Sequence, residues 1–360
     1  MGTKKTILNQ NYENYWKLTL EYSDIYGVKY NRTLKIIVDF IDNNYVTTFN
    51  FSSKYKELQE KLDKVYPKKD MASVRKSINQ FVKLGFIKYQ LSGYHKKVKK
   101  FLNETNKERK RRIFSEIVYS SASFNSSITE ESQEKEVNFF IKTLEVNHSL
   151  NKDEIMGLVL TTPSAYVKGY LNKQELEESV RFSQSIGFDE RKYNQLRFIS
   201  EVFGKLEGIC YDGEKFYLET DSSVEDAQIV TTKKRDNYLQ RLYKNQLKQE
   251  SKELFGDVVC MISKVPYYAM IASHIKPFVD SLAQEEYDPQ NGLLLGKDLD
   301  FMFDQGYISV ADDGKIILCD GIKSKIVEYH RLENLYIDTR LLTPERREYL
   351  NYHRNYIFKN

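Results

Sequence analysis

Tyr268-Ala269-Met270-Ile271-Ala272-Ser273-His274-Ile275-Lys276-Pro277 is an apolar stretch that ends at a histidine, one of five in a chain of 360 residues. An apolar run at residues 258–262 precedes it, and a polar loop leads from it to Asn291-Gly292-Leu293-Leu294-Leu295. Short apolar runs bounded by turn residues are typical of strands, and the pattern of residues 297–305 is helical. We therefore predict two strands, the second ending at His274, then a short strand opened by Asn291, and a helix directly after it.

The predicted helix carries two carboxylates, Asp300 and Asp304, which lie on one helical face because they are four residues apart. Hydrolysis of a phosphodiester needs a base that deprotonates water, a hard cation that stabilises negative charge, and a group that orients the base. An imidazole is a suitable base because it titrates near neutral pH. A carboxylate suits Mg²⁺ or Mn²⁺, which prefer oxygen ligands. The stretch thus contains the residue types that metal-dependent phosphodiester hydrolysis requires.

The ordered motifs resemble the HNH (ββα-metal) endonucleases, in the branch found among restriction enzymes. They run from Cys260 through the His274 stretch, Asp288-Pro289-x-Asn291-Gly292 and Asp300-x-x-Phe303-Asp304-x-Gly306 to the tail at residues 342–353, and the resemblance covers roughly residues 235–358. It implies that His274 is the general base, that Asn291 steadies the His loop, and that Asp300 is a ligand of Mg²⁺ or Mn²⁺.

The chain departs from these enzymes at the residue before the base, which is often an aspartate and a metal ligand but is Ser273 here. A hydroxyl is a weaker ligand, so Asp304 or a water is left to supply the second contact. The alternative for Asp304 is a cap at the helix end. The three cysteines are too few for the four-cysteine zinc site of some HNH proteins. We expect Cys260 to pack in the core and His353 to be structural, with phosphate contact as its alternative.

The N-terminal region contains two segments that resemble winged helices. In residues 33–100, three helical patterns precede a predicted strand at 86–89 and a turn at Ser92-Gly93. The third helix, Met71–Leu84, is expected to direct polar side chains outward into a DNA major groove: Arg75, Lys76, Asn79, Gln80 and Lys83.

Residues 150–220 repeat this layout, with helices predicted at 152–160, 173–186 and 190–203 and a hairpin turn at Asp212-Gly213. Between the two segments lies a basic run, Lys96–Lys110, continued by Arg111 and Arg112, which is expected to follow a DNA backbone. The alternative for both segments is an ordinary helical scaffold. Residues 233–255 read as a charged, solvated linker helix.

Length and composition limit the remaining possibilities. The net charge of +4 is too small to indicate a polyanion partner by itself. No apolar run approaches a membrane span, the start Met1-Gly2-Thr3-Lys4-Lys5 leads into polar residues, and the cysteines form no disulfide framework. A cytoplasmic protein with no membrane partner is expected.

The sequence thus predicts an α+β protein with three domains: winged-helix-like units at 1–118 and 119–230, and a linker helix with an HNH nuclease domain at 231–360. The expected function is a type II restriction endonuclease, possibly of type IIS, that cuts double-stranded DNA. We expect a homodimer at least transiently on DNA, and a cognate methyltransferase in the same system that is not a stable subunit. Two alternatives stay open: a modification-dependent HNH nuclease, and a DNA-binding regulator with a degenerate nuclease domain.

Overall fold

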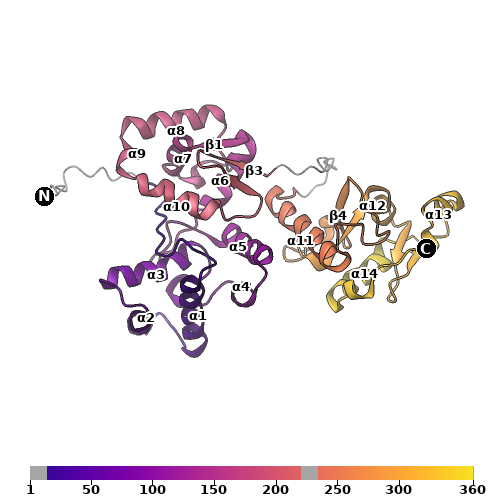
Figure 1. Cartoon of the computed structure of the whole chain (residues 1–360), viewed down its shortest axis with the longest axis horizontal. Coiled ribbons are helices and arrows are strands. Elements are labelled where there is room, and N and C mark those ends of the chain that lie inside the picture. Colours follow the sequence, from indigo (N-terminus) through magenta and orange to yellow (C-terminus); the bar gives the residue numbers. More distant parts are fainter. Residues whose placement is uncertain (1–13, 220–233, 360) are drawn as a thin grey trace. The chain divides into compact units, whose positions relative to one another are not determined.

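The structure is a computed structural model that describes residues 14–219 and 234–359. The chain divides into two compact units, Met1–Glu219 and Thr220–Asn360, which we call the first and the second unit (Figure 1). The predicted domain boundary at residue 230, and Lys233 of the predicted linker helix, lie outside the described residues. Both units are helical with small antiparallel sheets, as expected for an α+β chain.

The first unit begins with helices. Its elements are α1 (Val28–Asn43), α2 (Phe51–Val65), α3 (Met71–Lys83), α4 (Val98–Asn103), α5 (Lys107–Ser121), α6 (Glu136–Asn147), β1 (Ser149–Asn151), α7 (Lys152–Val159), α8 (Lys173–Ser185), α9 (Phe188–Arg191), α10 (Tyr193–Phe203), β2 (Ile209–Tyr211) and β3 (Lys215–Leu218).

The helices predicted in the first part of this unit are present, but the hairpin after them is not a pair of strands. Helix α3 ends before Gly85, which has a φ of +78° and lies so close to Ser121 that a side chain would not fit. A single antiparallel bridge joins Ile87 to Tyr94, and a 3₁₀ turn, Tyr89–Leu91, lies between them. The predicted strand at residues 86–89 is therefore wrong, because one bridge replaces a ladder.

The second part of this unit follows the prediction more closely. Helices α7, α8 and α10 lie at the predicted positions, and β2 and β3 pair on either side of Asp212-Gly213. Gly213 has a φ of +100°, which a hairpin turn requires and glycine adopts without strain. The structure adds α6 and β1, which the prediction lacks, and gives a sheet of order β1-β3-β2.

Side chains of the N-terminal segment pack into the second part of the first unit. The indole of Trp16 is buried against Phe124 and Phe139, and its Nε1 donates to the carbonyl of Thr161 at 2.8 Å. The two predicted subdomains therefore share contacts within one compact unit. Their division at residues 118 and 119 stays a prediction.

The second unit has its own apolar core. Its elements are α11 (Asn237–Phe255), β4 (Met270–His274), β5 (Gly292–Gly296), α12 (Lys297–Asp304), β6 (Ile308–Val310), β7 (Ile316–Leu318), α13 (Ser324–His330) and α14 (Pro344–Tyr356). Strands β4 and β5 pair antiparallel and α12 follows β5 at once, so the order strand, strand, helix agrees with the prediction. Helix α14 begins with Thr343 as N-cap and Pro344 in its first turn.

Two predictions for the second unit are wrong. Helix α11 is not a solvated linker, because Leu242, Tyr243 and Leu247 are buried, and Tyr243 and Leu247 belong to one apolar core with residues of β4 and β5. Residues 258–262 form no strand, although residues 259–262 are buried, and the backbone N–H of Met261 makes one hydrogen bond to Leu294 of β5. Among the described residues, none of the helices has both the length and the apolar character needed to cross a membrane.

Candidate active site

The hairpin β4-β5 places His274 at the end of a strand, opposite Gly292. Tyr243 of α11 fills the space beside this pair. Its hydroxyl donates to the carbonyls of Asn291 at 3.0 Å and Ser273 at 3.3 Å, and it lies so close to Gly292 that a side chain there would collide with it. The ends of both strands are therefore held by one buried tyrosine.

His274 lies in an aromatic pocket and is 7% exposed. Its ring stacks on Tyr243 at 4.8 Å between centroids and meets Phe278 edge-on at 5.6 Å. Nε2 lies 2.8 Å from the carbonyl oxygen of Glu286, to which only an N–H can donate. This bond fixes the tautomer, and the other ring nitrogen keeps its lone pair. Burial lowers the pKa of His274 to about 4, so the ring is neutral at pH 7 and able to accept a proton.

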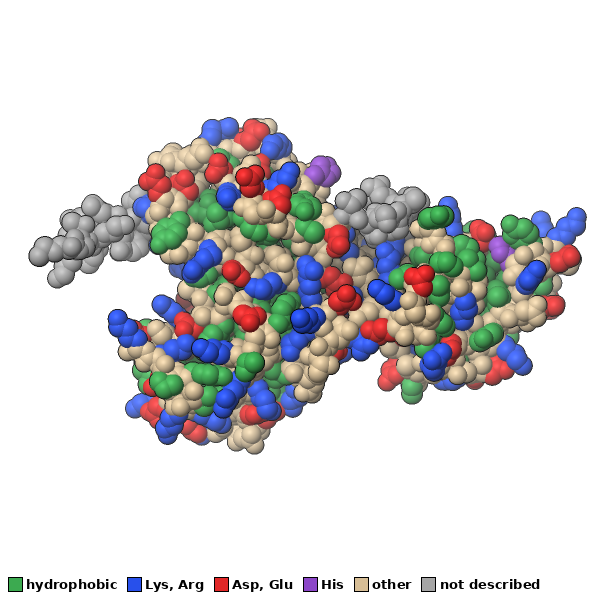
Figure 2. All heavy atoms as spheres, viewed as in Figure 1, with side chains coloured by type: hydrophobic (Ala, Val, Ile, Leu, Met, Phe, Trp, Pro, Cys, Tyr) green, Lys and Arg blue, Asp and Glu red, His purple; other side chains and the backbone are tan. Residues whose placement is uncertain are grey.

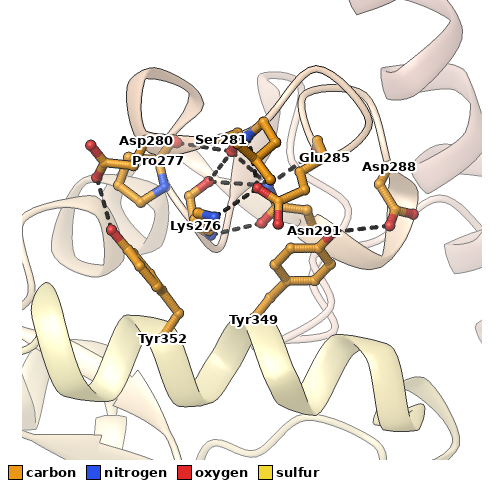
Figure 3. Close-up of polar contacts among 10 residues, drawn as sticks. Lys276, Pro277, Asp280, Ser281, Glu285, Asp288, Asn291, Tyr349 and Tyr352 are labelled. Atoms are coloured by element: carbon orange, nitrogen blue, oxygen red, sulfur yellow. Dashed lines mark hydrogen bonds and ion pairs between the residues drawn. The ribbon is translucent and has the colours of Figure 1, made fainter.

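The loop between β4 and β5 closes around Asn291, which is fully buried (Figure 3). Its Oδ1 accepts from the backbone N–H of Lys276 at 2.7 Å, and its Nδ2 lies within hydrogen-bond distance of the carbonyls of Lys276 and Glu285 and of the Ser281 hydroxyl. One side chain thus joins the residues just after His274 to the far end of the same loop. The role of Asn291 in steadying the His loop stays a prediction, and these contacts provide the geometry that it needs.

Helix α14 supports the same loop from outside, as Figure 3 shows. The Tyr349 hydroxyl donates to Asp288 at 3.1 Å, and the Tyr352 hydroxyl donates to Asp280 at 3.3 Å. Arg346, which is fully buried, forms a two-fold ion pair with Glu250 of α11 and donates to the carbonyl of Pro289 at 2.9 Å. Helices α11 and α14 therefore fix the position of the loop through side chains.

The carboxylate side of the site is built from Ser273 and α12. The Ser273 hydroxyl donates to Asp304 Oδ1 at 3.3 Å, so Asp304 makes a contact with β4 as well as ending α12. Asp304 is exposed overall and Asp300 is half-buried. Desolvation of its carboxyl, followed by the negative charge of Asp300, raises the pKa of Asp304 above the usual carboxyl range. Each carboxylate makes ionisation of the other less favourable, and a bound cation would relieve this repulsion.

The donors present fit Mg²⁺ or Mn²⁺. Among residues 14–219 and 234–359, no three His, Cys, Asp or Glu side chains come together as a metal cluster. Mg²⁺ needs fewer protein ligands than that, because it keeps several waters and binds one or two carboxylates together with substrate phosphates. Asp300 and Asp304, with the hydroxyl of Ser273, supply hard oxygen donors of this kind.

The polar face predicted for α3 is only partly exposed. Arg75 and Lys76 face solvent, whereas Gln80 and Lys83 are buried. Gln80 Oε1 accepts from the backbone N–H groups of Glu21 and Tyr22 at 2.8 and 2.9 Å. The prediction that Gln80 and Lys83 point outward is therefore wrong.

Lys83 and Asn79 bind backbone on a later segment of the chain. Lys83 donates to the carbonyl of Phe124 at 2.5 Å, and burial lowers its pKa to about 8. Asn79 is half-buried and accepts from the N–H of Ile128 at 2.9 Å. These side chains fasten α3 to its neighbours, so Arg75 and Lys76 alone are left as open candidates on this helix.

The arginines expected to follow a DNA backbone are also engaged within the first unit. Arg112 is buried and forms a two-fold ion pair with Glu207 at 2.9 and 2.8 Å. Arg111 donates to the carbonyls of Lys205 and Leu206. The guanidinium of Arg112 is therefore engaged with Glu207 inside the unit and does not face a DNA backbone. Figure 2 shows basic and acidic side chains interspersed on the visible face.

Tyr243 and Arg346 belong to the candidate site but lie outside the motifs that the sequence shows. Tyr243 belongs to a stripe with Leu239, Leu242 and Leu247 at helical spacing, which was the available signal for a buried face. Arg346 carries no such signal, since a charged residue in the first turns of a helix is usually exposed.

The comparison with known families agrees with this geometry. Residues 260–311 match the family model described as HNH endonuclease, and the match includes β4, β5 and α12. A comparison with curated proteins returns no match. HNH nucleases generally use divalent metal ions. The second unit thus contains a segment that matches the HNH endonucleases, and the match suggests that this chain is a DNA endonuclease and hence a hydrolase.

Proposed function

We propose that the chain is a site-specific DNA endonuclease of type II, with His274 as the general base. The observation that carries this proposal is the hairpin β4-β5, which presents a neutral, tautomer-fixed imidazole at His274 next to Ser273, whose hydroxyl binds the carboxylate of α12. This arrangement provides a proton acceptor beside oxygen donors for a cation, which is what hydrolysis of a phosphodiester needs.

In the proposed reaction, a water oxygen bonds to phosphorus while the bond from phosphorus to the leaving oxygen breaks. His274 takes the proton from the attacking water on its free ring nitrogen, and the leaving oxygen is protonated from solvent. The carbonyl of Glu286 holds the other N–H and stabilises the imidazolium that forms. Asp300, Asp304 and Ser273 would hold Mg²⁺ or Mn²⁺. A bound cation would stabilise the charge on the phosphate and on the leaving oxygen.

The first unit supports the site-specific part of the proposal. We propose that it reads double-stranded DNA through winged-helix-like parts, with Arg75 and Lys76 of α3 facing the duplex. A large separate unit suits a specific enzyme, because contacts to phosphates alone supply nonspecific affinity. The proposal includes cleavage at a distance from the recognised sequence, as in type IIS enzymes. It also includes a cognate methyltransferase in the same system.

Ser273 favours a second candidate, a DNA-binding regulator whose nuclease domain is inactive, because a hydroxyl is a weaker metal ligand than the aspartate often found there. The test is incubation of plasmid DNA with the purified chain in Mg²⁺, Mn²⁺ or EDTA, using methylated and unmethylated substrates. Cleavage of unmethylated DNA that EDTA stops supports the type II proposal. Cleavage of methylated DNA alone supports a modification-dependent enzyme, and binding without cleavage supports the regulator.

His274→Ala is the matching variant for this test. We expect it to lower the cleavage rate by at least about 100-fold with DNA affinity nearly unchanged, since removal of a general base has an effect of that order. His330→Ala, which changes a histidine of α13 that makes no contact with the loop in the described structure, serves as control and should cleave like wild type. A rate for His274→Ala close to wild type would exclude the assigned base.

A further inference from the structure

Arg235 precedes Asp236, the N-cap of α11, and its side chain reaches an aromatic neighbour of His274. The Cζ of Arg235 stands over the ring of Phe278, 5.1 Å from its centroid. The same ring meets His274 edge-on at 5.6 Å. The guanidinium and the imidazole therefore contact one aromatic side chain, although 38 positions of sequence separate Arg235 from His274 and Phe278 lies in the loop after β4.

One donor of the guanidinium has no partner. Arg235 Nε is buried and, among the residues that the structure describes, forms no hydrogen bond. Arg346 in the same unit shows the usual alternative, since it binds Glu250 and two carbonyls. Buried donors normally have partners, and one without a partner costs free energy. A ligand that carries acceptors would remove that cost.

The charge of Arg235 acts on both halves of the site. Its positive charge interacts with His274 and with Asp304. The arginine is thus within electrostatic reach of the base and of the carboxylates, and an anion bound to it would lie close to both.

We propose that Arg235 binds a non-bridging oxygen of the scissile phosphate and stabilises the negative charge that develops there during hydrolysis. The inference rests on the proposed nuclease function and adds a substrate-binding residue to it. A guanidinium matches the geometry of a phosphate, which can accept two of its parallel N–H groups. The phosphate gains charge as water adds, so this contact is stronger in the transition state than in the bound substrate. Loss of Arg235 should therefore lower the rate more than the affinity.

The test uses the full chain and single-turnover cleavage of plasmid DNA in Mg²⁺, with enzyme in excess so that the rate reports the chemical step. We compare wild type with Arg235→Ala, Arg235→Lys and the control Lys234→Ala, which removes an exposed charge one residue away. We expect Arg235→Ala to be at least about 100-fold slower, in line with the loss of one charge-stabilising donor, and DNA affinity to change less than about threefold. Arg235→Lys should be intermediate, and Lys234→Ala should stay within about threefold of wild type.

Two further measurements separate a phosphate contact from support of Phe278. Millimolar guanidinium chloride should partly restore cleavage by Arg235→Ala and leave His274→Ala unchanged, because it supplies the missing donor. The thermal unfolding midpoint of Arg235→Lys should equal that of wild type. A rate of Arg235→Ala within threefold of wild type, no rescue by guanidinium, or an equal loss in Lys234→Ala would each overturn the inference.

Failure of the proposed function is recognised separately. If wild type leaves DNA intact in both Mg²⁺ and Mn²⁺, the nuclease proposal fails, and the arginine is then judged by binding of a duplex oligonucleotide at several salt concentrations. One phosphate contact contributes a slope of about 0.9 to the dependence of log affinity on log salt. A slope in Arg235→Ala that is lower by about that amount supports the contact with phosphate, and an unchanged slope excludes it.

Discussion

The two carboxylates of α12 and the hydroxyl of Ser273 are the residues on which metal dependence of the proposed enzyme rests. The structure favours a role for Asp304 beyond ending the helix, because its carboxylate accepts from Ser273 and its pKa responds to desolvation and to Asp300. A residue that only capped the helix would not need either neighbour. Both carboxylates are therefore expected to contribute to cation binding.

Asp300→Asn and Asp304→Asn should each raise the Mg²⁺ concentration needed for half-maximal cleavage by about tenfold or more, because a hard cation loses an anionic oxygen ligand. The measurement is a Mg²⁺ titration of the cleavage rate, with EDTA as the zero point. Asp298→Asn is the control, since Asp298 is an exposed carboxylate in the first turn of the same helix. If Asp304→Asn needs the same Mg²⁺ concentration as wild type for half-maximal cleavage, Asp304 does not bind the cation and only ends the helix.

At the scale of elements, α14 and β6 meet through a buried histidine. His353 Nδ1 lies 2.8 Å from the Ser309 hydroxyl and Nε2 lies 3.0 Å from the carbonyl of Phe303, on whose ring the imidazole stacks. Burial lowers the pKa of His353 from 6.5 to about 4. His353 is therefore structural, as the sequence predicted, and its hydrogen bonds join α14 to α12 and to β6.

This lowered pKa makes the stability of the second unit depend on pH. Below about pH 6.5 the unfolded chain binds a proton that the folded chain excludes, so the free energy of unfolding should decrease as the pH falls from 6.5 towards 4. Above pH 6.5 the group has no effect. Urea unfolding of wild type and His353→Asn at several pH values tests this. Between pH 6.5 and 4, the free energy of unfolding of His353→Asn should depend less steeply on pH than that of wild type, by up to about 1.4 kcal/mol per pH unit. Equal slopes in the two proteins would show that His353 does not titrate as described.

The predictable part of the structure is the part in which local pattern decides the outcome. Apolar runs bounded by turn residues located β4 and β5, and the helical pattern of residues 297–305 located α12. Gln80 and Lys83 were misplaced because their partners, the backbone at residues 21, 22 and 124, are far away in sequence. A polar side chain on a helix is usually exposed, and only the tertiary fold supplies the backbone groups that bury it.

The positions of the candidate site residues were predictable to the extent that they lie on one hairpin and one helix. His274 and Asn291 stand where the sequence indicated, and the loop geometry explains why an amide is needed at position 291. The supporting residues were not predictable in this way. Tyr243, Arg346 and Arg235 come from segments outside the motif. The many charged residues of α11 led to the prediction of a solvated helix, although one face of it is buried.

At the scale of the whole molecule, recognition is proposed to reside in the first unit. A fragment of residues 1–230 should bind DNA with sequence preference, and residues 233–360 should bind weakly and without preference. The physical reason is that base-edge contacts need a separate surface such as the exposed face of α3, whereas a cleavage site contacts mainly the backbone. Electrophoretic mobility shifts with a pool of random duplexes measure this. Arg75→Ala with Lys76→Ala in the longer fragment is the matched variant, and a preference that travels with residues 233–360 would contradict the assignment.

Stoichiometry is the remaining property at this scale. Each chain offers one His274, and a double-strand break requires two cuts, so we expect two chains to cooperate on DNA. Closed two-fold symmetry is the usual arrangement of homo-oligomers and would give each strand an equivalent site. Linearisation of a plasmid should therefore rise more steeply than first order at limiting enzyme. Wild type mixed with His274→Ala should accumulate nicked circles, because a mixed pair cuts one strand.

A tight dimer formed before binding would make the cleavage rate proportional to the enzyme concentration, so sedimentation of the free protein accompanies the kinetics. If the free protein sediments as a monomer, the rate is first order and the inactive partner has no effect, then a single chain makes both cuts in turn.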